Sequence, residues 1–209
     1  MASKKLDKLN KLYAYVRKGT NGFHSESVKP HLDILIDYAS QCKTVTEFGV
    51  DTACSTVAFL NSGCKKVYSY DVVITPNARF VKQAADHDGM FFRLIEKDNL
   101  KAKIRNTDLL FIDTDQWYGQ LKAELMRHHS RVKKWIVIHD TETFGLINPF
   151  DGRQGMKAAM YEFMEVHPEW QIKQHYEIGD GMTVLERTNK FRTGWFRRKT
   201  KMVEREDLE

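Results

Sequence analysis

Short apolar runs alternate along this chain with longer segments of helical periodicity. The β-branched and aromatic runs from residue 44 onward predict strands at 44–49, 66–71, 91–95, 107–113 and 134–139. The segments between them predict helices at 53–62, 77–88, 99–105 and 117–131. Such alternation is typical of βαβ units, so the central part of the chain should form a parallel sheet.

The two ends of the chain add further elements. Apolar positions at helical spacing predict two helices within residues 1–43, which would cover the sheet or the mouth of a pocket. After a loop rich in Gly and Pro, a helix is expected at 156–166, and strands at 170–178 and 182–187 flank Gly179-Asp180-Gly181 as in a β-hairpin. The pattern thus predicts an α/β three-layer sandwich with a seven-stranded, mostly parallel sheet and an antiparallel C-terminal hairpin.

Composition adds limits to this picture. The chain has 209 residues, of which 42% are hydrophobic, and this favours one globular domain. It contains no apolar run near the roughly 20 residues that cross a bilayer, and no signal-peptide core follows the Lys-rich start. We expect a soluble, cytoplasmic protein with no membrane partner. Cys42, Cys54 and Cys64 are odd in number and lack CxxC spacing, which favours buried reduced thiols.

The formal charge of +5 belongs to the ends of the chain. Residues 1–20 carry +5 and residues 188–209 carry +3, so residues 21–187 carry −3. This distribution favours a solvated helix face and a basic C-terminal tail at 188–209 over a nucleic-acid surface. The aromatic residues within the tail leave open that it docks on a partner subunit, as in a homo-oligomer, or on an anionic surface.

The segment 46–56 carries the most specific chemistry. Glu47 and Gly49 lie where the first strand should run into a helix, and Asp71 ends the next strand. Glycine lets the backbone approach a ligand, the helix start offers free N–H groups, and a carboxylate after the second strand can accept both ribose hydroxyls. This is how a Rossmann-like sheet binds the adenosine end of a cofactor. The alternative for Asp71 is an acid that caps a helix or a turn.

Asp113, His139 and Asp140 end the fourth and fifth strands, and the carboxyl edge of an open α/β sheet is where ligands bind. Two carboxylates with an open coordination sphere suit Mg²⁺. His139 is either a general base, a softer metal ligand or a histidine that orients a loop. Asp115 either joins the metal site or caps the helix expected at 117, and the cap is favoured.

These strand ends resemble those of class I S-adenosylmethionine-dependent methyltransferases. The resemblance rests on Glu47-Phe48-Gly49 through Ser55, on Asp71, on Phe111 to Asp115 and on Ile136 to Thr141, and it covers residues 25–187. Within that superfamily it is closest to the small metal-dependent O-methyltransferases, including the catechol, macrolide-sugar and cephalosporin-hydroxylase-like groups. It implies a methyltransferase-like Rossmann domain at 44–187 that binds S-adenosylmethionine.

The resemblance also implies roles for individual residues. Glu47 and Gly49 would shape the turn near the methionine moiety, Ser55 would cap the helix or contact the methionine carboxylate, and the loop at Asp98 would contact adenine. Asp113 and Asp140 would hold the divalent metal, Mg²⁺ above all. The acceptor would be a small molecule with a hydroxyl group, in one version a sugar, and His139 and Asp113 would serve catalysis.

One position departs from the pattern acid-x-Gly-x-x-x-Gly-x-Ser/Thr. Ala53 stands at the second glycine, so its methyl group intrudes where the family has none. This substitution motivates a second hypothesis, an inactive cofactor-binding or regulatory module. The basic ends motivate a third, a methyltransferase that acts on RNA.

Overall fold

The computed structural model describes residues 7–24 and 26–188. The strands are β1 (Thr44–Phe48), β2 (Lys66–Asp71), β3 (Phe91–Glu96), β4 (Thr107–Ile112), β5 (Val132–His139), β6 (Trp170–Tyr176) and β7 (Met182–Arg187). The α-helices are α1 (Asp7–Lys18), α2 (Leu32–Ser40), α3 (Cys54–Asn61), α4 (Pro76–His87), α5 (Tyr118–His128) and α6 (Met156–Val166). Three 3₁₀ turns complete the described elements: η1 (Lys29–His31), η2 (Asn99–Lys101) and η3 (His129–Arg131).

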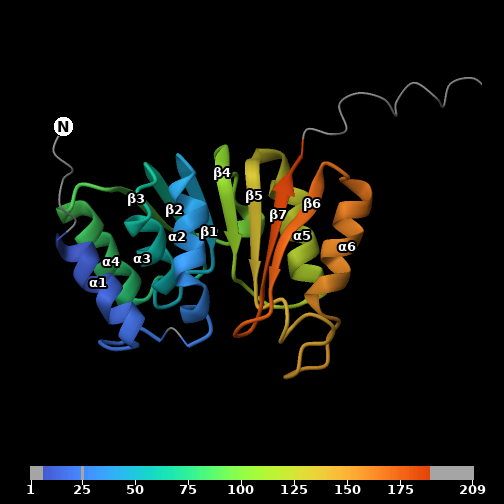
Figure 1. The fold of residues 1–209 in the computed structure, drawn as a ribbon, viewed down its shortest axis with the longest axis horizontal. Helices are drawn as coiled ribbons and strands as arrows, with labels where there is room; N and C mark the ends of the chain where they lie inside the picture. The colour runs from blue at the N-terminus through green and yellow to red at the C-terminus, as the bar shows by residue number, and fades with distance from the viewer. Residues whose placement is uncertain (1–6, 25, 189–209) are drawn as a thin grey trace, which may run out of the picture.

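The seven strands form one sheet in the order β3-β2-β1-β4-β5-β7-β6 (Figure 1). The first five strands are parallel, and β7 pairs antiparallel with both β5 and β6. The chain reverses direction across the sheet between β3 and β4, so the loops after β1 and β4 diverge at the centre. This divergence is the switch point at which open α/β sheets bind ligands. The predicted fold class is confirmed.

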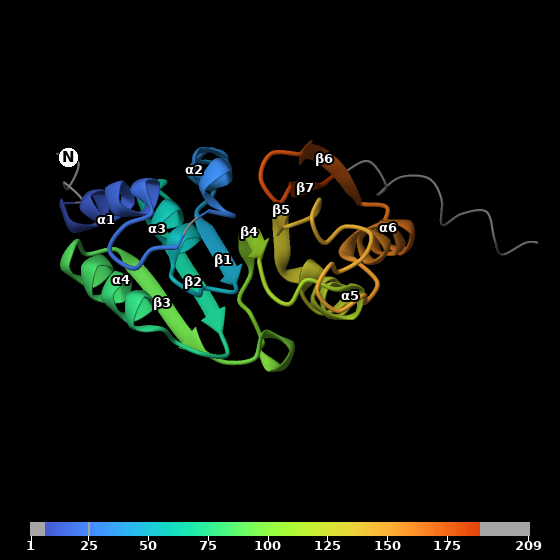
Figure 2. The same cartoon turned by 90° about the horizontal axis from the view of Figure 1, so that it is seen from below.

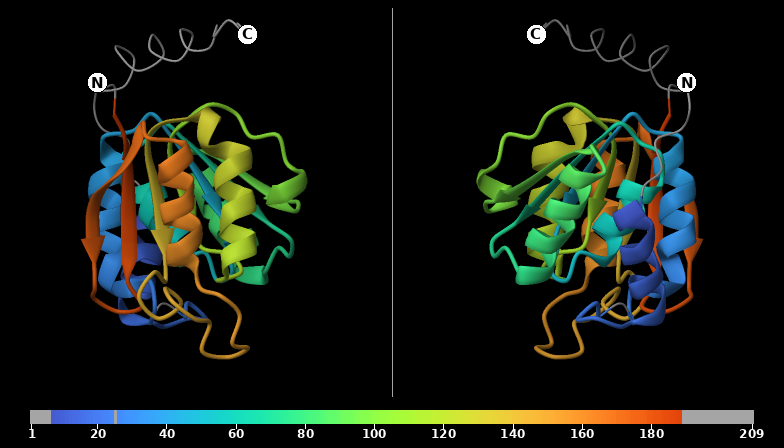
Figure 3. Two further views of the ribbon diagram at one scale, coloured as in Figure 1. Left: turned by 90° about the vertical axis from the view of Figure 1, so that its right-hand side faces the viewer. Right: turned by 90° about the vertical axis from the view of Figure 1, so that its left-hand side faces the viewer.

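Two hydrophobic cores lie on opposite faces of the sheet. Alternate residues of β4 point to opposite sides: Leu109 and Phe111 pack with α1 to α4, and Leu110 and Ile112 pack with α5 and α6. Figure 2 shows this division, and the end-on views of Figure 3 show α2 and the pair α5 and α6 on opposite sides of the sheet. The strands β4 and β5 are therefore buried on both faces, as their continuous apolar runs predict.

The expected helix at 99–105 is wrong. The chain forms only the single turn η2 there, with the Asp98 side chain accepting a hydrogen bond from Leu100 N (2.8 Å), and then becomes extended at Ala102. Residues 102–105 alternate between buried Ala102 and Ile104 and exposed Lys103 and Arg105, which is the period of an extended segment. The second of the two helices expected within residues 1–43 begins at Leu32, directly after the 3₁₀ turn η1 that contains Pro30.

Other expectations can be compared directly. The three cysteines are buried and form no disulfide, as their spacing predicts. In the part of the chain that the structure describes, every helix is too short or too polar to cross a bilayer. The basic tail lies outside the described residues except for its first position.

Candidate active site

The carboxyl ends of β1 and β4 meet at Gly49. This glycine has φ +83°, and a Cβ atom added to it would lie 1.7 Å from the carbonyl oxygen of Asp113. Gly49 N donates to Tyr70 O (3.0 Å), and Asp113 N donates to Phe48 O (2.9 Å). A side chain cannot occupy this position, so glycine brings the ends of three strands together.

Asp71 at the end of β2 holds the turn that follows Gly49. Its Oδ2 atom accepts hydrogen bonds from Val50 N (2.7 Å) and Asp51 N (3.2 Å), and its Oδ1 atom accepts one from Val73 N (3.1 Å). These bonds give Asp71 the turn role that was the alternative at the sequence level. Because a carboxylate oxygen can accept two hydrogen bonds, Oδ1 keeps an acceptor position for a ligand hydroxyl.

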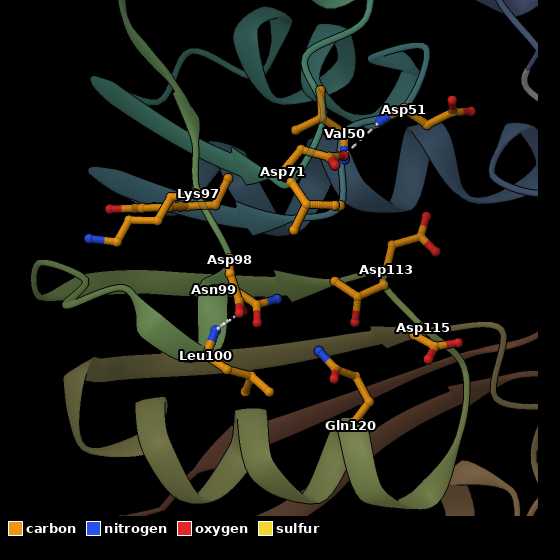
Figure 4. Close-up of a pocket in the computed structure, with 14 residues that line it drawn as sticks. Val50, Asp51, Asp71, Lys97, Asp98, Asn99, Leu100, Asp113, Asp115 and Gln120 are labelled. Carbon is orange, nitrogen blue, oxygen red and sulfur yellow. Dashed lines mark hydrogen bonds between the residues drawn. The ribbon is translucent and has the colours of Figure 1, made fainter.

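A cleft of about 470 Å³ opens beside Asp71. Gly49, Asp98 and Asp113 also line it, and Figure 4 shows Asp71, Asp98 and Asp113 around one opening at the ends of β2, β3 and β4. Its size is that of a small-molecule or cofactor pocket. A second cleft of about 270 Å³ adjoins it and shares Gly49 and Asp113 with it. Ser55 and Asp140 line this second cleft.

Glu47 lies beneath the clefts and lines neither of them. It is fully buried, and its carboxylate accepts hydrogen bonds from Ser55 (2.6 Å), Thr56 (2.7 Å) and Ser69 (2.5 Å). Burial raises the pKa of Glu47 to about 7, and the three hydroxyl groups oppose this rise. Glu47 therefore joins β1, β2 and α3 from inside. Ser55 donates to Glu47 and does not cap α3, so the capping role expected for it is wrong.

Ala53 begins α3 in a left-handed conformation, with φ +66° and ψ +30°. This conformation costs an L-residue roughly 1–2 kcal/mol and is the reason that glycine favours such a position. The Ala53 side chain is fully buried. The methyl group that departs from the family pattern is thus accommodated by packing, at the cost of backbone strain.

Asp113, His139 and Asp140 form one cluster. One potential ligand atom from each lies within 4.8 Å of the others. His139 Nδ1 is 2.7 Å from Asp140 Oδ1 and 3.6 Å from Asp113 Oδ1. The His139 side chain is completely buried, whereas that of Asp113 is about one quarter exposed. The structure therefore brings together the three residues that the strand ends predicted.

The charges of this cluster are coupled. Burial by itself would lower the pKa of His139, but Asp113 and Asp140 outweigh it and raise that pKa to about 10. Burial would also raise the pKa of Asp140, but the nearby His139 ring, together with hydrogen bonds from Ser27 and Gln116, holds that pKa below its ordinary value. In the absence of a metal, an imidazolium therefore lies between two carboxylates.

Three polar contacts to this cluster come from residues that the sequence did not reveal. His31 Nδ1 lies 3.0 Å from His139 Nε2 in the core, Ser27 donates to Asp140 Oδ1 (3.0 Å), and Gln116 donates to Asp140 Oδ2 (2.9 Å). Burial, followed by the charge of His139, lowers the pKa of His31 to about 4, so His31 is neutral and accepts the hydrogen bond. His31 and Ser27 are more than 100 positions from their partners, and no local pattern marks them.

Two other expectations concern Asp115 and Asp98, which line the first cleft. Asp115 does not cap α5, whose N-cap is Trp117; it lies near Arg153, at 3.3 Å, on the outer side of the first cleft. The favoured cap is therefore wrong. Asp98 lines the same cleft as Asp71, but its carboxylate is engaged by Leu100 N (2.8 Å) and by Lys101 (3.2 Å).

Comparison with known proteins shows which fold carries this site. No protein-family model matches the chain, and no curated protein matches it at the sequence level. Solved structures do match. The 1,6-didemethyltoxoflavin-N1-methyltransferase of Burkholderia thailandensis, with its substrate and S-adenosylhomocysteine bound, is 13% identical over 90% of this chain and 92% of its own, at a TM-score of 0.61.

Two further structures are similar to the same extent. The magnesium protoporphyrin IX methyltransferase of Synechocystis, with S-adenosylmethionine bound, is 11% identical over 90% of this chain and 100% of its own, at a TM-score of 0.61. A candidate caffeoyl-CoA O-methyltransferase of Staphylococcus aureus is 14% identical over 88% of this chain and 100% of its own, at a TM-score of 0.58. The chain has the class I methyltransferase fold. At these identities the likeness extends to the fold and not to the substrate.

Within the methyltransferase fold, the acidic cluster meets the chemical requirements of a metal site. His139 Nδ1 is buried and forms no aligned hydrogen bond with any described residue, although two carboxylate oxygens are near it. Two carboxylates and one imidazole nitrogen are a donor set for Mg²⁺ or Mn²⁺. On the other side of the ring, His31 Nδ1 lies 3.0 Å from His139 Nε2 and fixes the ring orientation, as outer partners of metal-binding histidines do. The residues present thus fit a divalent cation.

Proposed function

We propose that the protein is an S-adenosylmethionine-dependent O-methyltransferase that acts on a hydroxylated small molecule with the help of a divalent metal, Mg²⁺ above all. One observation carries the proposal: Asp113 belongs to the cluster with His139 and Asp140 and also lines both clefts, so it connects the proposed cofactor space with the proposed metal site. The methyltransferase fold is the argument for the cofactor, and the cluster of Asp113, His139 and Asp140 is the argument for the metal. A sugar is the acceptor class that the resemblance adds.

The first cleft would hold the cofactor. Asp71 would accept a ribose hydroxyl at Oδ1 while its other bonds keep the turn after Gly49 in place. Asp98 and its neighbours would border the adenine. Glu47 has no direct contact with either cleft, so its role in cofactor binding is to hold β2 and α3 against β1. Ser55, which lines the second cleft, would approach the methionine carboxylate from there.

The second cleft would hold the acceptor hydroxyl. In the reaction the bond between sulfur and the methyl group breaks, a bond between the acceptor oxygen and the methyl group forms, and the hydroxyl proton leaves. Asp113, Asp140 and His139 would hold the divalent cation, which would lower the pKa of the acceptor hydroxyl group. Asp113 is the member of the cluster that reaches both clefts, so it is placed to orient the hydroxyl and to accept its proton.

His139 would act through the carboxylates. It lies behind them, lines neither cleft and is bonded to His31 on its other side. Direct proton abstraction from a substrate by His139 therefore finds no support in this geometry. Its proposed role is that of a metal ligand and positioning residue.

The proposal is tested by calorimetry with S-adenosylhomocysteine and, separately, with Mg²⁺ and Mn²⁺. We expect cofactor binding in the micromolar range and metal binding that Asp113→Asn weakens by at least about tenfold, because one of two carboxylates is lost. Asp115→Asn is the matched control, since this carboxylate lines the same cleft but pairs with Arg153. No binding of the cofactor at millimolar concentration would refute the proposal.

Turnover separates the proposal from its rival. Cofactor binding without methyl transfer to any of a broad panel of hydroxylated acceptors, with and without metals, would favour an inactive binding module. The strained Ala53 is the observation behind that rival. Transfer that depends on Mg²⁺ would exclude it.

A further inference from the structure

Among the residues that the structure describes, no helix covers one face of β2 and β3. In Figure 2, α3 and α4 lie on one side of these strands, whereas α5 and α6 lie over the half of the sheet that contains β5 and β7. The helix expected at 99–105 would have been the next element on the open side. In its place, the extended segment 102–106 borders the face, with Ala102 and Ile104 turned into the second core.

This open face forms a groove of about 440 Å³. It is lined by alternate residues of β2 and β3 and by the extended segment: Lys66, Tyr68, Tyr70, Phe91, Arg93, Ile95, Lys103 and Arg105. The strand register explains the arrangement, because Lys66 pairs with Phe91 and Tyr68 pairs with Arg93. Cations and rings therefore follow one another along a single face.

The groove is strongly basic, and none of the described residues that line it carries a carboxylate. None of its four cations forms a salt bridge with another of the residues described by the structure. The contrast with the rest of the domain is large, since residues 21–187 carry a net charge of −3 even with these four cations included. Four unneutralised cations in an otherwise acidic body indicate an anionic ligand.

The rings define the ligand further. Phe91 is 40% exposed, and both Lys66 Nζ and Arg93 Cζ lie over its ring, at 5.5 and 5.4 Å from the centroid. Tyr68 lies next to it, with ring centroids 5.6 Å apart. An exposed ring among cations is the combination with which proteins bind single-stranded nucleic acid: phosphates pair with the cations and a base stacks on the ring.

We propose that this groove binds a single-stranded nucleic acid through Lys66, Arg93, Lys103 and Arg105, with a base stacked on Phe91. Tyr70 lines both the groove and the candidate cofactor cleft, so a bound strand would end beside that cleft. A flat bilayer would not follow a recessed groove. The proposal goes beyond the methyltransferase reaction and does not depend on it.

The test is fluorescence anisotropy of the full chain with labelled 12-nucleotide oligo-U RNA and oligo-dT DNA. A groove variant, K66Q/R93Q/K103Q/R105Q, is compared with a control variant of equal net charge, K11Q/K18Q/R79Q/K82Q. The control positions lie on α1 and α4, on the other face of the sheet, and both variants keep the basic tail. The two oligonucleotides show whether the groove prefers RNA or DNA.

We expect micromolar binding at 50 mM salt. The groove variant should lose at least about tenfold in affinity, and the slope of log affinity against log salt should flatten by about 3, as expected for four phosphate contacts on a single strand. The control variant should keep most of the affinity, and Phe91→Ala should lose about tenfold with an unchanged slope.

Three results would overturn the proposal. One is the absence of binding by the wild-type chain to either oligonucleotide at 100 µM protein. Another is an equal loss in the groove and control variants, which would assign the binding to overall charge. The third is a groove variant that keeps its affinity for both oligonucleotides but loses binding to vesicles of anionic phospholipid.

Discussion

The close approach of β1 and β4 makes Gly49→Ala the most informative single substitution. The added Cβ atom would lie 1.7 Å from the Asp113 carbonyl oxygen, whereas real Cβ contacts are essentially never below 3.0 Å. One of the two strand ends must therefore move by more than 1 Å. Because Asp113 carries the carboxylate shared by the two clefts, this movement would also displace the acidic cluster.

The magnitude follows from two separate costs. An alanine at φ +83° costs about 1–2 kcal/mol, and the clash adds about 1–3 kcal/mol or more, as in overpacked cores. Restricting the unfolded chain returns about 0.4–1 kcal/mol. We expect Gly49→Ala to lower the free energy of unfolding by about 2–4 kcal/mol and to weaken binding of Mn²⁺ or Mg²⁺.

Gly63→Ala is the matched control. Gly63 has nearly the same backbone angle, φ +84°, but has nothing within 4 Å of the added Cβ atom. It should cost about 1 kcal/mol and leave metal binding unchanged. Urea unfolding measures both variants. Equal destabilisation of the two would refute the reasoning, since only Gly49 is packed against another strand.

Three further predictions concern buried residues around the clefts. Burial raises the pKa of Glu47 to about 7 in the folded state alone, so the folded protein binds this proton more tightly than the unfolded chain does. The free energy of unfolding of the wild type should therefore fall by about 3 kcal/mol as the pH rises from 4.5 to 7. Glu47→Gln should remove this fall, as measured by urea unfolding at different pH values. His31→Ala should weaken Mn²⁺ binding by about tenfold or more, measured by calorimetry, and His31→Asn, which keeps an acceptor, should restore part of it. Ala53→Gly should leave the free energy of unfolding within about 1 kcal/mol of that of the wild type. Relief of the strain in the left-handed backbone would offset the lost burial of the methyl group and the greater freedom of the unfolded chain. A larger loss of stability would contradict the strain assigned to Ala53.

The failed helix at 99–105 shows where pattern reasoning stops. The segment has apolar residues at intervals that a helix could use, but Asp98 closes a single turn and the chain then alternates between core and solvent. A four-residue alternation is too short to outweigh the expectation that a helix follows each parallel strand. Only the position of Ala102 and Ile104 against the second core decides it.

The succession of strands and helices along the chain, the mostly parallel sheet and the placement of Asp71, Asp113, His139 and Asp140 at one edge followed from the sequence. They did so because side-chain periodicity and strand ends are local properties, and a parallel sheet brings all such ends to the same side. The partners of these residues did not follow from it. His31 contacts His139, which is 108 positions away, and the cations of the open groove are aligned by the strand register. Contacts between such distant segments depend on how the whole chain packs, so the sequence of either segment alone does not predict them.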